Sequence, residues 1–304
     1  MKHSPTAICS ADWHIRSDTP TCRTDNYSGA QKKKIKFILD LAGKHDCPIL
    51  IAGDLGHRPV WGDELLNLTI NIIAPKLRDN VEIIMVPGQH DLLNHRIDMW
   101  DKRGLGVLEK KGLLKYEYDY ITICREGINI HSFPYGKKIK ETGFSDINIA
   151  LCHMMVIKSQ KDKLWPDQKT HSAQWYLKKF PCYDLIVTGD NHQSFVTEYE
   201  GRFLVNPGSL MRMTADQINH KPSVYLWYAK ENKVERVYLP IEKNVIDRSH
   251  IEVKENHEEK INSFVQCLQD NIDIGFSFND NLDRYIKKNK LKRPILNELK
   301  ESME

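Results

Sequence analysis

Carboxylate and imidazole side chains recur in this chain in short motifs, each placed at the end of an apolar run. The motifs are Asp12-Trp-His14, Gly53-Asp54, Gly88-Gln-His90-Asp91, His153 and Gly189-Asp-Asn-His192. Carboxylate, imidazole and amide ligands without a thiolate favour Mn, Fe or Zn chemistry over a structural zinc site. Two ions about 3.5 to 4 Å apart that share a carboxylate can activate water and hold both oxygens of a phosphate ester. The motifs therefore predict a two-metal phosphoesterase, with Asp54 as the natural bridge.

Short, β-branched runs precede the motifs and must position them. The runs cover residues 7–9, 49–52, 81–86, 147–151 and 185–187. Residues that follow such strands gather at one edge of a sheet when strands and helices alternate. The sequence predicts that this edge carries the site.

The motifs, in this order, resemble those of the calcineurin-like metallophosphoesterases over roughly residues 5–240. Within them, Gly53-Asp-Leu-Gly-His57 followed by Pro59 is similar to an element of the SbcD-type DNA repair exonucleases. The resemblance implies an α/β fold, an αββα sandwich of two mixed sheets flanked by helices. It also implies a hydrolase of ester bonds that acts on DNA.

The resemblance implies one role for each matching ligand position. Asp12, His14 and His192 would hold the first ion with Asp54, which also reaches the second ion, and His153 would complete the second site. Gln89 stands where the family has asparagine, and its longer side chain displaces the amide oxygen. Asp190 stands where the family has histidine, and its carboxylate should harden the second site towards Mn²⁺ or Mg²⁺. Mn²⁺ is the first expectation for both ions, with Mg²⁺ or Fe²⁺ as alternatives.

His90 matches the catalytic histidine of the family, which assists departure of the leaving oxygen. We expect Asp91 to orient His90 and His57 to lie near the substrate. The expected substrate contacts come from two arginines near the first motifs and from the loop after the last metal motif. They are Arg16, Arg58, Asn206, Ser209 and Arg212.

Composition limits the remaining possibilities. The 304 residues contain 40% hydrophobic residues, enough for one large core with an appended segment. No apolar run approaches the roughly 20 residues of a membrane span, and the N-terminus lacks the pattern of a secretory signal, so a cytoplasmic protein is expected. The seven cysteines form no C-x-x-C pair, and Cys152 beside His153 is not expected to form a dyad, because adjacent strand residues point to opposite faces.

The net charge of +3 demands no nucleic-acid partner, but its distribution is suggestive. Between Lys137 and Lys179 lie nine Lys or Arg residues against four acids, interleaved with Trp165, Trp175 and Tyr176. Such a segment can follow a phosphate backbone and stack on bases, or form an ordinary solvated face.

Helices are expected at residues 29–44, 62–78 and 99–111. The lysines at 32, 33, 34 and 36 should form the solvent side of the first. Further strands are expected at 120–124, 127–133, 195–199, 202–205, 223–228 and 234–239.

A boundary near residue 245 divides a nuclease domain (1–245) from a C-terminal helical segment (246–304). This segment contains three amphipathic candidates, around residues 261–272, around 282–286 and from Pro294 onwards. By resemblance, the segment binds an SbcC-like SMC-type ATPase, although it could instead pack on the nuclease core.

The resemblance implies Mn²⁺-dependent 3′-to-5′ exonuclease and endonuclease cleavage of DNA, by a homodimer assembled with ATPase subunits in repair or recombination. Two alternatives stay open. One is a stand-alone phosphatase or cyclic-nucleotide phosphodiesterase on the same scaffold. The other is a degenerate subunit that binds DNA or the ATPase without catalysis, suggested by Gln89 and Asp190.

Overall fold

The computed structural model describes residues 4–77, 81–116, 120–123, 127–142, 147–162, 170–249, 261, 263 and 278–289. The chain divides into one unit at residues 1–247 and a second at residues 248–304. All of the candidate site residues lie in the first unit.

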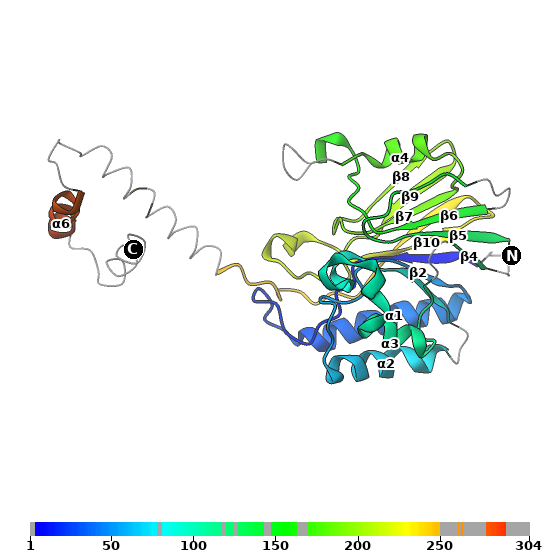
Figure 1. Cartoon of the computed structure of the whole chain (residues 1–304), viewed down its shortest axis with the longest axis horizontal. Coiled ribbons are helices and arrows are strands. Elements are labelled where there is room, and N and C mark those ends of the chain that lie inside the picture. Colours follow the sequence, from blue (N-terminus) through cyan, green and yellow to red (C-terminus); the bar gives the residue numbers. More distant parts are fainter. Residues whose placement is uncertain are drawn as a thin grey trace. The chain divides into compact units, whose positions relative to one another are not determined.

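The first sheet of this unit has five strands (Figure 1). They are β1 (Ala7–Ser10), β2 (Ile49–Ala52), β3 (Ile83–Val86), β10 (Ser223–Tyr228) and β11 (Lys233–Tyr238), in the order β11-β10-β1-β2-β3. β1, β2 and β3 are parallel, whereas β10 and β11 are antiparallel to their neighbours.

The second sheet has six strands. They are β4 (Tyr120–Ile123), β5 (Ile128–Phe133), β6 (Ile147–Cys152), β7 (Leu185–Thr188), β8 (Phe195–Tyr199) and β9 (Arg202–Asn206), in the order β4-β5-β6-β7-β9-β8. β5, β6, β7 and β9 run parallel, and the edge strands β4 and β8 are antiparallel.

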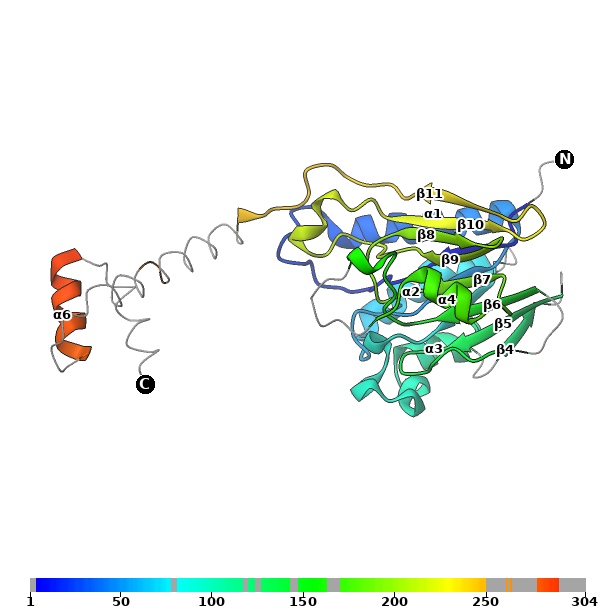
Figure 2. The same ribbon diagram turned by 90° about the horizontal axis from the view of Figure 1, so that it is seen from above.

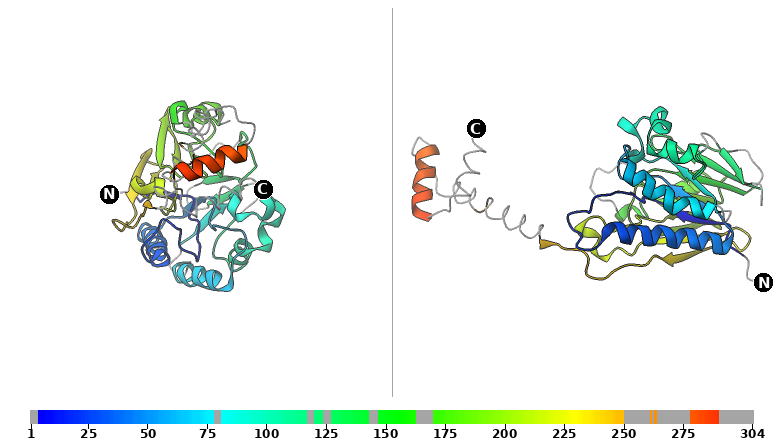
Figure 3. Two further views of the ribbon diagram at one scale, coloured as in Figure 1. Left: turned by 90° about the vertical axis from the view of Figure 1, so that its left-hand side faces the viewer. Right: turned by 90° about the horizontal axis from the view of Figure 1, so that it is seen from below.

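Four helices cover the outer faces of the two sheets. α1 (Tyr27–His45), α2 (Asp63–Leu77) and α3 (Gly104–Lys110) lie on the first sheet, and α4 (Ala173–Lys179) lies on the second (Figures 2 and 3). Alternate residues of each strand face opposite layers: in β1, Ile8 packs among helix residues, whereas Ala7 and Cys9 pack against the second sheet. The predicted αββα sandwich of two mixed sheets is confirmed.

The predicted helix at 99–111 is interrupted. A 3-10 helix at Ile97–Lys102 ends at Arg103, whose extended backbone (φ −132°, ψ −165°) separates it from α3. The apolar periodicity of the segment continues across this break, which is why the sequence predicted a single helix.

The lysines of α1 do not all face solvent, as the sequence analysis expected. Lys34 is 3% exposed, and its Nζ donates a hydrogen bond to the carbonyl oxygen of Leu210 at 2.9 Å. Its flexible stem carries the ammonium inward to the loop that follows β9, a reach that helical periodicity alone does not reveal.

We expect Lys34→Met to change how the free energy of unfolding depends on pH. Burial, with a smaller contribution from Arg23, lowers the pKa of Lys34 from 10.5 to about 7. Between pH 7 and pH 10.5 the unfolded chain binds more protons at Lys34 than the folded chain does. Burial of this lysine therefore lowers the free energy of unfolding most at neutral pH, and this loss becomes smaller as the pH rises. The stability of Lys34→Met relative to wild type, from urea unfolding, should be greatest near pH 7 and decline towards pH 10.

Lys33→Met is the matched control, because Lys33 is exposed and its ammonium contacts Glu242 at the surface. A difference between Lys34→Met and wild type that stays constant from pH 7 to 10 would contradict the buried-lysine interpretation.

The second unit contains α6 (Phe278–Asn289), which includes the predicted amphipathic candidate at 282–286. Leu282 of this helix is buried. The third candidate, most of the candidate at 261–272, and Trp165 lie outside the described residues. No helix in the described ranges is long and apolar enough to span a bilayer.

Candidate metal centre and active site

The five motifs meet where the carboxyl ends of the parallel strands in both sheets come together. Asp12 and His14 follow β1, Asp54 follows β2, and His153 directly follows β6. Main-chain hydrogen bonds join the first two loops, since Asp12 N donates to the Gly53 carbonyl at 3.1 Å and His14 N to that of Asp54 at 2.9 Å. The topology therefore gathers residues that lie up to 180 positions apart in sequence (12 to 192).

Four candidate ligands have left-handed backbone conformations: Asp12 (φ 48°), His14 (φ 45°), Asp54 (φ 52°) and Asp190 (φ 74°). Such conformations cost about 1 to 3 kcal/mol each, persist only where the surrounding structure enforces them, and concentrate at functional sites. The strain turns these side chains towards a common point instead of continuing the strands.

Asp12, His14 and His192 form the first group of potential metal ligands. The Nε2 atoms of His14 and His192 lie 3.2 Å apart, and Oδ2 of Asp12 is buried without a hydrogen-bond partner among the described residues. Two imidazole nitrogens at this separation suit two ligands of one ion, because Zn–N bonds, for example, measure about 2.0 to 2.1 Å.

Asp54 stands between this group and His153. Its Oδ2 lies 3.7 Å from Nε2 of His14 and 3.5 Å from Nε2 of His153, and no hydrogen bond reaches it from the described part of the chain. Its Oδ1 accepts a hydrogen bond from the His90 amide at 2.8 Å. One carboxylate oxygen thus fixes the carboxylate and the other is left facing both groups, which is the placement that a bridging ligand requires.

His153 is fully oriented by the main chain. Its Nδ1 donates to the carbonyl oxygen of Ala52 at 2.8 Å, so Nε2 is turned towards Asp54. Burial disfavours a charge on His153, but Asp54 outweighs it and raises the pKa of His153 to about 10. Asp54 therefore favours a proton on Nε2 of His153, and this nitrogen would have to release that proton to bind a metal ion.

Gln89 and Asp190, the two departures from the family pattern, contact each other. Gln89 Nε2 donates to Oδ1 of Asp190 at 2.6 Å, and Gln89 Oε1 lies 2.7 Å from Nε2 of His153. The longer glutamine side chain thus reaches across the second site and places its amide oxygen beside His153. Asp190 is half-buried and lies at the same place.

The donor set fits divalent ions. Burial lowers the pKa of His14 and of His192, which keeps nitrogen lone pairs available at neutral pH. The unpartnered buried oxygens of Asp12 and Asp54 are the hard donors that such ions prefer. The His/Asp cluster is therefore able to bind metal ions.

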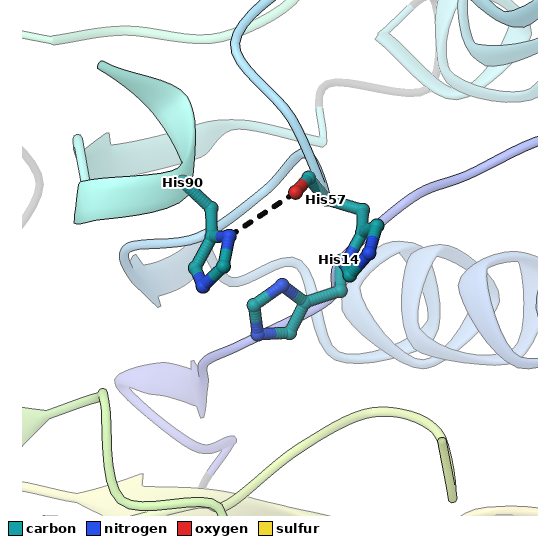
Figure 4. A group of neighbouring side chains, drawn as sticks. All are labelled: His14, His57 and His90. Carbon is teal, nitrogen blue, oxygen red and sulfur yellow. Dashed lines mark hydrogen bonds between the residues drawn. The ribbon is translucent and has the colours of Figure 1, made fainter. Parts of the chain in front are cut away.

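The rings of His14, His57 and His90 lie close together at the site (Figure 4). His90 Nδ1 donates to the His57 carbonyl oxygen at 3.1 Å, and the His90 ring lies edge-on to that of His14 with centroids 4.9 Å apart. His57 stacks parallel to His90 at 5.8 Å. Burial and the charge of Arg16 lower the pKa of His57 to about 4, so this ring is neutral at pH 7.

Asp91 does not contact the His90 ring, contrary to the expectation that it orients this histidine. Its buried carboxylate accepts hydrogen bonds from the backbone amides of Leu55, Gly56 and Gly88 at 2.9 to 3.2 Å. Burial and the nearby Asp54 raise the pKa of Asp91 to about 7. Asp91 thus joins the loops after β2 and β3, and the His57 carbonyl orients His90 in its place.

The expected substrate contacts separate into two sets. Arg58 is exposed beside His57, and the half-buried Arg16 side chain is paired with Asp18 at the same rim. Arg58 is therefore accessible from the surface near His57, whereas the guanidinium of Arg16 is already engaged by Asp18.

Asn206, Ser209 and Arg212 are buried and hydrogen-bonded to groups inside the protein, so the substrate contacts expected at these positions stay a prediction. Asn206 Nδ2 donates to the carbonyls of Asn191 and Gln193, and Arg212 donates to those of Ile218 and Glu242. Ser209 donates to the Met211 carbonyl. Polar side chains in a tightly folded loop satisfy buried carbonyls first, and thereby hold the segment that carries His192.

The lysine-rich segment forms an aromatic cluster around α4. His171 stacks on Trp175 with centroids 3.7 Å apart, and Lys179 Nζ lies 4.5 Å from the centre of the same indole. Because an imidazole and an ammonium already contact this indole, it is a poor platform for a base.

Sequence analysis missed three polar residues close to the site: His220, Lys221 and Arg236. They line a cavity together with Asp190 and His192. The sequence offered little signal for them, because Lys221 and Arg236 lie well beyond the last metal motif and are brought together only by the pairing of β10 with β11.

Comparisons with solved structures find several matches of low sequence identity. A novel archaeal phosphodiesterase is 10% identical with a TM-score of 0.41, and the match covers 77% of this chain and 99% of that one. TT1561 of Thermus thermophilus is 11% identical (TM-score 0.48, 77% and 99% covered). The phosphopantetheinyl hydrolase of Mycobacterium tuberculosis is 14% identical (TM-score 0.45, 78% and 97% covered).

No curated protein matches the chain. A family model described as calcineurin-like phosphoesterase matches residues 6–194. That stretch contains every candidate metal ligand, from Asp12 to His192.

Proposed function

We propose that this chain, which belongs to the calcineurin-like phosphoesterase family, is a DNA nuclease of the SbcD type. As a member of that family it is a metal-dependent phosphoester hydrolase, and the proposal proceeds from this. The proposal includes Mn²⁺ as the metal, and both 3′-to-5′ exonuclease and endonuclease cleavage in DNA repair or recombination. One observation carries it: His57, from the SbcD-like element, lies beside the candidate catalytic His90.

His57 and His90 differ in the hydrogen-bonding groups that they offer a substrate. His90 uses its Nδ1–H on the His57 carbonyl, which leaves Nε2 for a phosphate oxygen or a leaving oxygen. The Nδ1 of His57 is buried without a hydrogen-bond partner in the described ranges. Two imidazole rings with two arginines nearby suit a phosphodiester with groups on both sides better than a terminal phosphate.

In the proposed reaction, water attacks the phosphorus of a DNA phosphodiester in line with the bond to the 3′ oxygen, and that bond breaks. When bound, divalent ions at the site neutralise the developing charge and lower the pKa of water. His90 supplies a proton to the departing 3′ oxygen or stabilises its charge, while the main chain of His57 holds the His90 ring in place.

The experiment compares wild type with His90→Ala and His57→Ala on end-labelled duplex and single-stranded DNA in Mn²⁺, with bis(p-nitrophenyl) phosphate as a small ester. We expect His90→Ala to lower kcat on DNA about 10²- to 10⁴-fold while the bound metal content is unchanged. His57→Ala should lower DNA cleavage more than turnover of the small ester. Hydrolysis of the small ester without any DNA cleavage by wild type would favour a stand-alone phosphodiesterase instead.

Metal content distinguishes a nuclease from the second alternative, a subunit that binds DNA or the ATPase without catalysis. A chain that binds fewer than two Mn²⁺ ions at saturation and hydrolyses neither substrate would be a degenerate binding subunit.

The proposed partner is an SbcC-like ATPase, bound by the C-terminal segment of a homodimer. α6 places Leu282, Tyr285 and Ile286 at the three- and four-residue spacing of one helix face, which is how amphipathic helices engage a groove. Repeating the DNA assay with such an ATPase and ATP tests this, because the proposal requires that the ATPase stimulate duplex cleavage.

A further inference from the structure

A cavity of ≈ 550 Å³ opens beside the candidate metal centre. Asp190 and His192 form part of its wall, and the remainder includes residues 193–194, several residues of 214–221 and Arg236. A group held in this cavity is therefore connected directly to the place where the candidate ligands meet.

The exposed Arg236 forms part of one wall of the cavity and is held there by three contacts. Its Nε donates to Ser223 Oγ at 3.0 Å and its Nη2 to the Lys221 carbonyl at 3.3 Å. The guanidinium also lies 4.7 Å from the ring centre of Tyr238. These contacts fix a cation at the wall without neutralising it, since none of these three partners is an acid.

Some polar groups of the cavity are already used and others are available. The side chains of Asn191 and Gln217 are committed to groups of the surrounding loops. Gln193, Asn219 and Lys221 are exposed. Amide and ammonium groups on the wall match the mixture of donors and acceptors on the edge of a nucleobase.

The size of the cavity indicates what it holds. Pockets that bury small organic ligands measure about 300 to 1,000 Å³, so this one suits a single nucleotide and not a longer strand. Inorganic phosphate alone would leave most of the volume and the amide groups without a function.

We propose that this cavity receives the terminal nucleotide of a DNA strand, with its base and sugar beside Asn219, Lys221 and Arg236. The inference rests on the proposed nuclease function and adds how the strand end is recognised. The first phosphodiester then lies at the metal centre. Hydrolysis of its bond to the 3′ oxygen transfers a water-derived oxygen to phosphorus, releases a 5′-mononucleotide and leaves a protonated 3′ oxygen on the shortened strand.

The test fills the cavity by Asn219→Trp. Ile218→Trp is the matched control, because Ile218 is the exposed neighbour in the same 3-10 helix (Ala215–Asn219) and does not line the cavity. Lys221→Ala is a milder variant that removes one cation without adding bulk. Each variant is assayed as the full chain in Mn²⁺.

Three readouts distinguish the possible results. Release of mononucleotides from a labelled strand end reports end recognition, and nicking of circular single-stranded DNA reports cleavage that needs no end. Fluorescence of a terminal 2-aminopurine in an uncleavable phosphorothioate strand reports unstacking of the end without any catalysis.

We expect Asn219→Trp to lower mononucleotide release about 100-fold, the scale of effect that misplacing a reacting group produces, while nicking of circles is preserved. Its terminal 2-aminopurine signal should also be lost, and Lys221→Ala should show a smaller loss of release. Ile218→Trp should match wild type in all three readouts.

Two results would overturn the inference in different ways. If Asn219→Trp releases mononucleotides and brightens 2-aminopurine as Ile218→Trp does, the cavity has no such role although the nuclease function stands. If wild type hydrolyses bis(p-nitrophenyl) phosphate but neither DNA substrate, the nuclease function fails and the inference fails with it.

Discussion

Asp54→Asn should lower the hydrolysis of both DNA and bis(p-nitrophenyl) phosphate by on the order of 10³-fold. The oxygen Oδ2 of Asp54 faces His14 on one side and His153 on the other. Replacing this oxygen by an amide nitrogen removes a negative charge. It also removes an oxygen that could coordinate a metal ion at either ligand group. We also expect metal content, measured by mass spectrometry of the gel-filtered protein, to fall below that of wild type.

Asparagine is the appropriate replacement because it isolates the ligand role. It retains an Oδ1 that accepts the His90 amide hydrogen bond, and asparagine tolerates the left-handed backbone at this position (φ 52°). The control is Asp40→Asn, which makes the same chemical change in a surface ion pair with Lys76. Retention of more than about a tenth of the wild-type activity by Asp54→Asn would argue against a bridging role.

Gly53→Ala should both unfold more easily and lose activity. A Cβ at this position would lie 2.0 Å from Nδ1 of His153, in the ring whose hydrogen bond to Ala52 sets its direction. The backbone is also left-handed, with φ +83°. Overpacking costs about 1 to 3 kcal/mol and a left-handed alanine about 1 to 2 kcal/mol, so we expect a total loss of about 2 to 5 kcal/mol in urea unfolding.

Two other glycines separate the causes of this loss. Gly136 has the same φ of +83° but nothing within 4 Å of its Cβ position among the described residues, so Gly136→Ala carries only the conformational cost. Gly62 has open space and no left-handed backbone, so Gly62→Ala should be close to neutral. Equal stability losses for Gly53→Ala and Gly136→Ala would show that the close approach of His153 contributes nothing.

The sequence was informative about the ligands because their chemistry and strand context coincide. Asp12, Asp54 and His153 each follow a short apolar run, and parallel strands bring such positions to one edge whatever the details of packing. The strands and the first two helices were recovered for the same reason, since a large core imposes a strong hydrophobic period, but α4 was not predicted and the helix expected at 99–111 is broken at Arg103. Both conclusions depend on residue type and spacing alone.

The sequence was misleading where direction decides the role of a side chain. Arg212 and Asn206 have the types expected for phosphate contacts, but they turn inward to buried carbonyls. Asp91 holds backbone amides, and Lys34 reaches from the expected solvent side of a helix to the Leu210 carbonyl. Each of these side chains hydrogen-bonds a backbone carbonyl or amide that comes within reach only in the folded protein. No local sequence pattern can therefore predict the contact.

The left-handed backbone at Asp12, His14, Asp54 and Asp190 limits how the site can change by mutation. Among residues other than glycine, asparagine, aspartate and histidine enter this conformation most readily, while β-branched and bulky side chains are strongly disfavoured. The backbone therefore admits nearly the same residue types that suit a hard or borderline metal. Any redesign of metal preference at these four positions can therefore draw on only a few residue types, because the backbone conformation excludes most of the others.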